Sequence, residues 1–276
     1  MRAFKYSIIL VGLLSFSTLQ AQTAVMSFNI RYDSAHDKEN RWEFRKMEIV
    51  DLIKYYQPDF LGVQEAMPNQ AEFLAENLDL YNYIGHGRDG ENTNSEGIPL
   101  FYNISKFELL TKEIFWLSET PEKASKGWDA AYKRIVVYGV FRNKTTKDTV
   151  HIFNCHFDHR GKVARVQSAK LLLESIRKKQ LAAKKVIIMG DFNSLPSENP
   201  IEILNQQFED SYKALNYPVY GPIGTYNGFD VKSMLTKRID YIFTKNIDVE
   251  SYRSIDDKRK NNLWFSDHLP VFIKLN

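Results

Sequence analysis

Cysteine is almost absent from this sequence, which has one among 276 residues, and internal repeats and low-complexity segments are lacking altogether. A single thiol cannot form an internal disulfide, so the fold depends on its hydrophobic core. Cys155 lies in an expected strand, where alternation directs it away from its neighbours Asn154 and His156 and into that core. Apolar residues make up 43% of the chain and aromatic residues 13%, enough for one large core and not typical of disorder.

A strong excess of one charge is also lacking, since 37 Lys and Arg residues face 34 Asp and Glu residues and the net charge is +3. In the opening "MRAFKYSIILVGLLSFSTLQAQ", basic residues precede an uncharged apolar stretch, and small and polar residues follow. This order predicts that residues 1–21 are a secretory signal peptide and that residues 22–276 form an exported domain, periplasmic or secreted. The stretch is too short to span a bilayer comfortably, so no stable membrane anchor is expected, with a retained N-terminal anchor as the alternative. Loss of Arg2 and Lys5 leaves a net charge of about +1, which gives no global attraction to nucleic acid.

Hydrophobic periodicity predicts a mixed α/β protein. Strands are expected at residues 24–30, 60–64, 97–102, 135–141, 150–157, 186–189, 239–244 and 269–275, and helices at 41–56, 69–78 and 162–181. In the first helix, we expect Asn40 to cap the start and Met47, Val50 and Ile53 to form the buried stripe. Two sheets packed face to face, with helices on their outer faces, accommodate both patterns. Residues 209–237 have little periodicity, and loops of such length are often functional.

Polar residues recur beside the predicted strands. In "GDFNS", Asp191 and Asn193 directly follow an apolar strand, although burial requires neither. The same pattern occurs at Asn29, Glu65, Asn154, His156, Asp158, His159, Asp240, Asp267 and His268. Each residue alone is explained by a turn, a helix start or a core position. Together they indicate a site, because loops at one edge of a sandwich bring distant residues together.

The residue types at these positions favour phosphate ester hydrolysis. Mg²⁺ takes oxygen ligands and keeps several waters, so one or two carboxylates such as Glu65 and Asp267 suffice. Zinc would call for more His or Cys ligands at closer spacing. Hydrolysis requires stabilised charge on the phosphoryl oxygens, an attacking water in line and help for the leaving oxygen. Acids, amides and two histidines can supply all three.

Seven segments, in this order, resemble the endonuclease/exonuclease/phosphatase superfamily, which has the DNase I-like fold. They are "SFNIR" at 27–31, "GVQE" at 62–65, "EGIPLFY" at 96–102, "NCHFDH" at 154–159, "GDFNS" at 190–194, "RIDYIF" at 238–243 and "SDHLPV" at 266–271. The resemblance implies a four-layer α/β/β/α sandwich with one active site where these loops meet. More narrowly, "GRDG" at 87–90 and "FWLSETP" at 115–121 resemble an exported bacterial branch.

The resemblance also implies a metal site. Glu65 would be the principal ligand of Mg²⁺, or of Mn²⁺, with Asn29 and Asp267 completing or supporting the site. Asp191 and Asn193 would hold the attacking water and a phosphate oxygen.

Two histidines carry the catalytic roles that the resemblance implies. His268 would be the general base, oriented by Asp240, and His156 would face the leaving group, oriented by Glu96, because a carboxylate partner fixes the tautomer and raises the basicity of the ring. Asp191 is the alternative base.

Four further residues are candidate substrate contacts, namely Asn154, Arg134, Arg165 and His159. The arginines could clamp a phosphate or equally serve surface ion pairs. His159 and Asp158 could touch the substrate or brace their loop. Tyr132 and Tyr226 could stack on a base or sugar, or belong to the core.

The leading hypothesis is an exported, metal-dependent phosphoesterase acting on a phosphate monoester or diester, with a small organic phosphate favoured, and working as a monomer. A DNase I-like nuclease is an alternative that the near-neutral charge disfavours. A sphingomyelinase-like phospholipid phosphodiesterase would need exposed aromatic loops. A non-catalytic binding module would be expected to have lost His156, Asp191 or His268, and all three are present.

Overall fold

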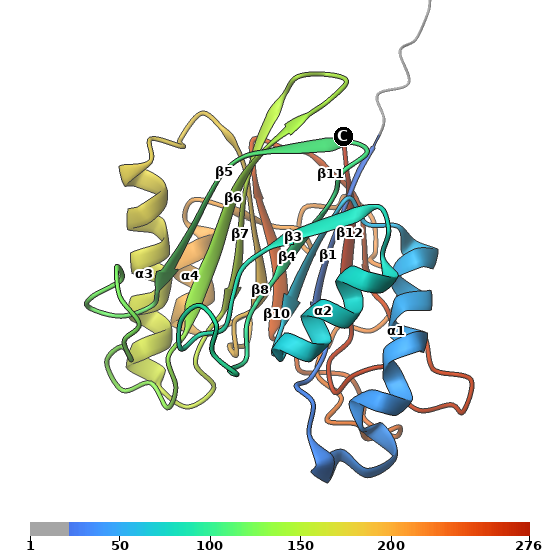
Figure 1. The fold of residues 1–276 in the computed structure, drawn as a ribbon. Helices are drawn as coiled ribbons and strands as arrows, with labels where there is room; N and C mark the ends of the chain where they lie inside the picture. Colours follow the sequence, from blue (N-terminus) through green and yellow to red (C-terminus); the bar gives the residue numbers. More distant parts are fainter. Residues whose placement is uncertain (1–21) are drawn as a thin grey trace, which may run out of the picture.

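Two six-stranded β-sheets face each other through an apolar interface in the computed structural model, which describes residues 22–276 (Figure 1). The first sheet has the order β11 (Val249–Ser254), β12 (Val271–Leu275), β1 (Thr23–Asn29), β2 (Phe60–Gln64), β4 (Leu100–Asn103) and β3 (Tyr81–Ile84). The second has the order β5 (Phe107–Trp116), β6 (Ile135–Asn143), β7 (Thr149–His156), β8 (Lys185–Asp191), β10 (Asp240–Lys245) and β9 (Glu209–Asp210). The predicted signal peptide lies outside the described residues.

Helices cover the outer face of each sheet (Figure 1). The first sheet packs against α1 (Trp42–Tyr56) and α2 (Pro68–Asn77), and the second against α3 (Lys162–Lys178) and α4 (Asn199–Asn205). A short 3₁₀ helix, η1 (Ala35–Asn40), precedes α1. This arrangement confirms the predicted four-layer α/β/β/α sandwich. Among residues 22–276, no helix combines the length and the apolar character needed to cross a membrane.

Strand register gathers the polar strand ends at one end of the sandwich. β1 runs parallel to β2, which sets Asn29 beside Gln64, and β7 runs parallel to β8, which sets His156 beside Asp191. β10 is antiparallel to β8, so its first residue, Asp240, also pairs with Asp191. The predicted site residues therefore come together because parallel strands end, and antiparallel strands begin, at the same edge.

The first helix differs from the prediction in its cap and its buried face. Asn40 does not cap it, because its side chain accepts a hydrogen bond from Arg259 Nη2 at 2.7 Å. Met47 is 51% exposed, whereas Ile49 and Ile53 are fully buried against the first sheet. The prediction of Val50 and Ile53 as core residues is correct and that of Met47 is wrong.

Candidate active site

A cavity of about 460 Å³ opens at the end of the sandwich where these strand ends meet. Nine predicted site residues line it, namely Glu65, Glu96, Arg134, His156, His159, Asp191, Asn193, Asp267 and His268. Tyr132 and Tyr226 line it as well. Five further residues that were not among the predicted site residues also line the cavity, namely Arg31, Tyr32, Arg88, Lys237 and Ile239. Three of them, Arg31, Arg88 and Ile239, belong to the quoted segments "SFNIR", "GRDG" and "RIDYIF", which was the signal available for them.

His268 is held by a hydrogen-bonded chain that begins in the backbone. The backbone N–H groups of Ile239 and Asp240 donate to Thr225 Oγ1, each at 3.1 Å, and the Thr225 hydroxyl donates to Asp240 Oδ2 at 2.5 Å. The same oxygen accepts from His268 Nδ1 at 2.8 Å, while the buried Oδ1 has no partner among the described residues. Burial acts to lower the pKa of His268, but the negative charges of Asp240 and Asp191 outweigh it and raise this pKa well above its ordinary value.

Asp191 lies between the two histidines. Its Oδ2 is 3.5 Å from His156 Nε2 and 3.8 Å from His268 Nε2. Its carboxylate also accepts hydrogen bonds from Asn29 Nδ2 and from the backbone N–H of Asn193. Burial, followed by repulsion from Asp240, raises the pKa of Asp191 to about 7. A carboxyl group that changes charge near neutrality is suited to accept a proton from water.

His156 has different partners from those predicted. Both ring nitrogens lie close to Arg134 Nη1, at 3.0 and 3.2 Å. Burial and the positive charge of Arg134 lower the pKa of His156 well below its ordinary value, so the ring is neutral. Glu96, which we expected to orient His156, instead accepts a hydrogen bond from Arg88 Nη1 at 2.8 Å. The predicted pairing of His156 with Glu96 is therefore wrong, although both residues line the cavity.

Asp158 supports the wall that carries Arg134. It is 1% exposed, and its carboxylate accepts hydrogen bonds from the backbone N–H groups of Ala131, Tyr132, Arg160 and Gly161 and from Arg134 Nε. Burial acts to raise the pKa of Asp158, but these bonds outweigh it and hold the pKa well below the ordinary value. Of the two roles left open for Asp158, bracing the loop is the one that fits.

Carboxylates and a histidine in the cavity could hold a divalent metal ion. Oxygen atoms of Glu65 and Asp191 and a ring nitrogen of His156 all lie within 4.8 Å of one another. Asp191 is buried beside other acids, which a cation would neutralise, so the donor set fits a hard divalent ion. The expected partner Asp267 lies 4.0 Å from Arg31 Nη1, which is also 3.9 Å from Glu65.

Asn29 holds the carboxylates of this cluster. Its Nδ2 donates to Glu65 Oε1 at 3.0 Å and to Asp191 Oδ2 at 3.1 Å, while its Oδ1 accepts from the backbone N–H of Arg31. In this orientation the amide oxygen faces the backbone, so Asn29 supports the acids and does not itself present a ligand oxygen.

Several residues at the cavity have left-handed backbone conformations. Arg31, Glu65 and Asn193 have φ values of 60°, 62° and 48°, which are uncommon for residues other than glycine. Gly190 has a φ of 149°, and a Cβ there would lie 1.9 Å from the Cys155 carbonyl oxygen, so only glycine fits before Asp191. Strain of this kind is concentrated at functional sites, and here it aims Glu65 and Asn193 into the cavity.

Arg45 fastens loops beneath the cavity. It projects from α1 and is fully buried, with Nε donating to the Asn40 carbonyl at 2.5 Å and Nη1 donating to the carbonyls of Ile30 and Phe265 at 2.8 and 2.7 Å. Burial lowers the pKa of Arg45 to about 10. Within residues 22–276, no carboxylate oxygen lies within 4.0 Å of this guanidinium. The cation is therefore solvated by backbone carbonyls of three separate segments.

Two predicted substrate contacts lie away from the cavity. Asn154 is fully buried and ties the sheets together, because its Nδ2 donates to the carbonyls of Val63 and Ile98 and its Oδ1 accepts from Gln64 Nε2 at 2.7 Å. Arg165 is 6% exposed and donates to the Asp158 carbonyl at 3.1 Å. Neither side chain is placed to touch a substrate in this structure. Cys155, by contrast, is buried in the core as predicted.

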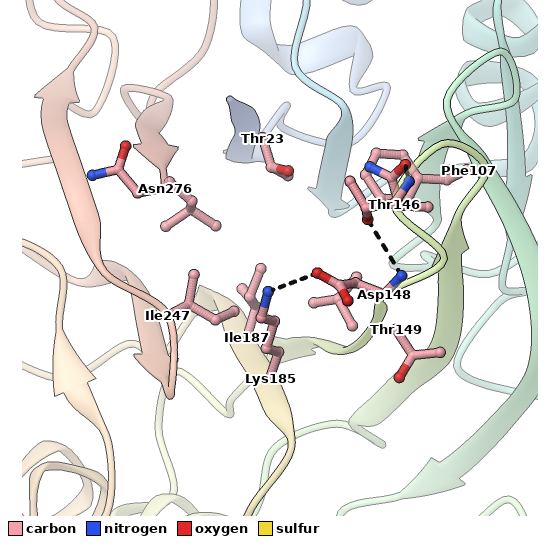
Figure 2. Close-up of a pocket in the computed structure, with 12 residues that line it drawn as sticks. Thr23, Phe107, Thr146, Asp148, Thr149, Lys185, Ile187, Ile247 and Asn276 are labelled. Atoms are coloured by element: carbon pink, nitrogen blue, oxygen red, sulfur yellow. Dashed lines mark hydrogen bonds and ion pairs between the residues drawn. The ribbon is translucent and has the colours of Figure 1, made fainter. Parts of the chain in front are cut away.

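A second cavity lies at the opposite end of the sandwich, where β1 begins and the chain ends (Figure 2). Its volume is about 60 Å³, room for roughly two water molecules. Its charged residues, Asp148 and Lys185, form an ion pair at 3.1 Å. Because it is small and holds no cluster of catalytic groups, the 460 Å³ cavity is the candidate active site.

Comparison with known proteins places these features in one family. The family model described as "Endonuclease/Exonuclease/phosphatase family" matches residues 26–268. The structure of the mannosyl-6-phosphatase of Bacteroides thetaiotaomicron is 34% identical, has a TM-score of 0.87 and covers 92% of this chain and 99% of that one. The structure of an endonuclease/exonuclease/phosphatase from Bacteroides vulgatus is also 34% identical, with a TM-score of 0.88 and coverages of 93% and 99%.

A curated viral protein is similar along most of its length. An uncharacterized protein of Acanthamoeba polyphaga mimivirus is 29% identical over 250 residues, which are 84% of this chain and 91% of the relative. The residues matched by the family model, 26–268, include every residue that lines the 460 Å³ cavity.

Proposed function

Because this chain belongs to the endonuclease/exonuclease/phosphatase family, we propose that it is an exported, Mg²⁺-dependent phosphatase that hydrolyses a small organic phosphate monoester. The observation that carries the proposal is the arrangement of Asp191 between His156 and His268 at the floor of a bounded cavity. Export rests on the predicted signal peptide alone.

The size and charge of the cavity support a small substrate. A volume of about 460 Å³ suits a phosphate group with one attached ring, since small-molecule sites are typically about 300 to 1,000 Å³. Four cationic residues line it, but Arg31, Arg88 and Arg134 each pair with a carboxylate. A nuclease tracking a nucleic-acid backbone would need a larger surplus of positive charge. The mannosyl-6-phosphatase similarity makes phosphorylated sugars the first monoesters to test.

Glu65 and Asp191 would hold the metal, with Asn29 supporting both carboxylates. When bound there, Mg²⁺ would supply positive charge to the phosphoryl oxygens. Asp267 also lines the cavity, with a carboxylate oxygen 4.0 Å from Arg31 Nη1, and would act on the site mainly through that cation.

Hydrolysis requires a proton to leave the attacking water. In the protein without metal, burial and Asp240 raise the pKa of Asp191 to about 7. The carboxylate would stay ionised with a cation bound, so the oxygen that is not used as a ligand can accept this proton. His268 was the expected base, but its pKa is raised by Asp240 and Asp191 despite burial, so in the protein without metal its Nε2 carries a proton and can donate to a phosphoryl oxygen. We therefore assign the base to Asp191, the alternative of the two.

His156 and Arg134 form the other side of the reaction site. Burial, followed by the positive charge of Arg134, lowers the pKa of His156 and keeps the ring neutral. The guanidinium of Arg134 can also pair with a phosphate oxygen. Asn193 Nδ2 donates to the Phe157 carbonyl at 3.1 Å, which fixes the amide at the cavity wall. Its remaining N–H and its oxygen are available to orient the water or the phosphate.

The test is a substrate screen with purified residues 22–276. Sugar phosphates, nucleotides, phospholipids, RNA and DNA are each incubated with Mg²⁺ and with excess chelator, and released phosphate and chain cleavage are measured. The expected result is phosphate release from a small monoester that stops with chelator. Cleavage confined to nucleic acid or phospholipid would reject the phosphatase, and full activity in chelator would reject the metal.

A further inference from the structure

Arg88 and Glu96 form an ion pair in the wall of the active-site cavity. Arg88 Nη1 donates to Glu96 Oε2 at 2.8 Å. The backbone fixes both residues, because the Arg88 N–H donates to the Glu96 carbonyl at 2.8 Å and the Trp116 indole N–H donates to the Arg88 carbonyl at 2.7 Å. Backbone hydrogen bonds therefore hold the ion pair in place as part of the cavity wall.

Some donors and one acceptor of the Arg88–Glu96 pair have no partner in the part of the chain that the structure describes. Among residues 22–276, Arg88 Nε and Nη2 have no acceptor, and Glu96 Oε1 has no donor. The guanidinium lies over the Tyr132 ring at 4.5 Å, and that ring stacks on His159 with centroids 5.7 Å apart. Stacking fixes the plane of the guanidinium, so free donors and a free acceptor stand side by side at the cavity.

This combination suits neutral hydroxyl groups better than a phosphate. Glu96 neutralises Arg88, and its free carboxylate oxygen would repel a phosphoryl oxygen. A hydroxyl group both donates and accepts, so two neighbouring hydroxyls can satisfy the guanidinium and the carboxylate together. Bonds to charged groups of this kind are the stronger class of hydrogen bond.

We propose that Arg88 and Glu96 recognise adjacent hydroxyl groups on the part of the substrate that carries the phosphate, which assigns the substrate class to sugar or polyol phosphates. This inference rests on the proposed phosphatase function. It also gives Glu96 a role in substrate selection in place of the orientation of His156.

The experiment compares a substrate that has adjacent hydroxyls with one that lacks them. kcat/KM is measured for mannose 6-phosphate, glucose 6-phosphate and phenyl phosphate with the wild type, Glu96→Gln and Arg88→Met, after circular dichroism has verified folding. The matched control is Asp89→Asn, which removes an exposed carboxylate that neighbours Arg88 and pairs with Lys133 at 3.0 Å outside the cavity.

The expected result is that the ratio of kcat/KM for the better sugar phosphate to kcat/KM for phenyl phosphate falls about tenfold or more in Glu96→Gln and Arg88→Met, because each loses bonds to a charged group. The control should keep the wild-type ratio. Equal losses on both substrates would overturn the inference, since they would place Glu96 in the reaction itself, and an unchanged ratio would overturn it too.

A binding measurement tests this inference independently of the proposed function. If the wild type hydrolyses no phosphate monoester, the phosphatase proposal fails, and calorimetric titration with mannose 6-phosphate then decides the inference. Weaker binding to Glu96→Gln than to the wild type and to Asp89→Asn would uphold recognition of hydroxyl groups. Equal binding to all three, or binding to none, would refute it.

Discussion

Replacing Asp240 with Asn should reduce activity far less than removing the side chain. Both hydrogen bonds to the carboxylate, from His268 and from Thr225, end on the same oxygen, Oδ2. The other oxygen has no partner. An asparagine can therefore place its single oxygen where Oδ2 was and its amide nitrogen where Oδ1 was. The His268 ring then keeps its position and its Nδ1 proton, and only the negative charge is lost.

The magnitude follows from the difference between charged and neutral hydrogen bonds. A bond to a charged group contributes about 1.5 to 3 kcal/mol and a neutral one about 0.5 to 1.5 kcal/mol. The loss of about 1 to 2 kcal/mol predicts a kcat for Asp240→Asn that is roughly 5- to 30-fold below the wild type. Asp240→Ala also frees the ring to rotate and change tautomer, so its kcat should fall by about 10³-fold or more.

The assay is kcat at saturating Mg²⁺ and saturating substrate for the wild type and both variants, with melting temperatures to verify folding. Thr225→Ser provides a matched control, because it keeps the hydroxyl group that bonds Oδ2 and the two backbone N–H groups, and its kcat should stay near that of the wild type. If folded Asp240→Asn were as inactive as Asp240→Ala, the charge itself, and not the orientation of the ring, would be what His268 requires. That result would refute the reasoning.

Three further predictions concern the metal and the substrate. Glu65→Gln should weaken Mn²⁺ binding, measured by calorimetry, and phosphate release together; normal metal affinity would exclude Glu65 as a ligand. Because the pKa of Asp191 is raised to about 7 by burial and by Asp240, protons compete with the metal below that pH. The Mn²⁺ dissociation constant should therefore rise about tenfold per pH unit as pH falls below 7 and level off above it, and Asp191→Asn should abolish this dependence. KM for the best small substrate should change only a few-fold between about 50 and 200 mM salt; efficient DNA turnover with a log-log slope of about −4 or steeper would instead indicate a nuclease.

The fold was predictable where hydrophobic patterns were long or motifs were specific. The strands that carry "SFNIR", "GVQE" and "GDFNS" lie within a few residues of their predicted bounds. The helices and strands that we did not predict have weak hydrophobic patterns in the sequence. β5 is an edge strand whose middle residues are mostly exposed, so it lacks a clear alternation, and α4 has only seven residues. β3, β9 and β11 were missed as well, being short or only partly buried.

The acids and histidines of the site could be predicted from the sequence, but the way in which they pair could not. Asp191 and His268 follow or precede apolar strands, where polar residues stand out. Arg88 and Lys237 do not stand out, because arginine and lysine are common in surface loops and only the folded loops bring them to the cavity. The change of partner at Glu96, from His156 to Arg88, depends on where two loops cross, which no local pattern in the sequence encodes.

Among the described residues, Arg45 bonds only main-chain oxygens, so the junction that it forms depends on the course of the backbone. It grips carbonyl oxygens of Ile30, Asn40 and Phe265, and every amino acid has a carbonyl. These bonds therefore depend on the course of the backbone and not on the side chains. The side chains have separate constraints, because Ile30 is buried in the core and the Asn40 side chain accepts a hydrogen bond from Arg259. A segment transplanted from a relative would have to reproduce the position of its own carbonyl. One that did not would leave the buried guanidinium with one bond fewer, a cost of about 1 to 3 kcal/mol. Arg45 therefore ties to α1 the segments that lead into Arg31 and Asp267, whereas the loop that carries Arg88 has no bond to Arg45 and could change without disturbing this junction.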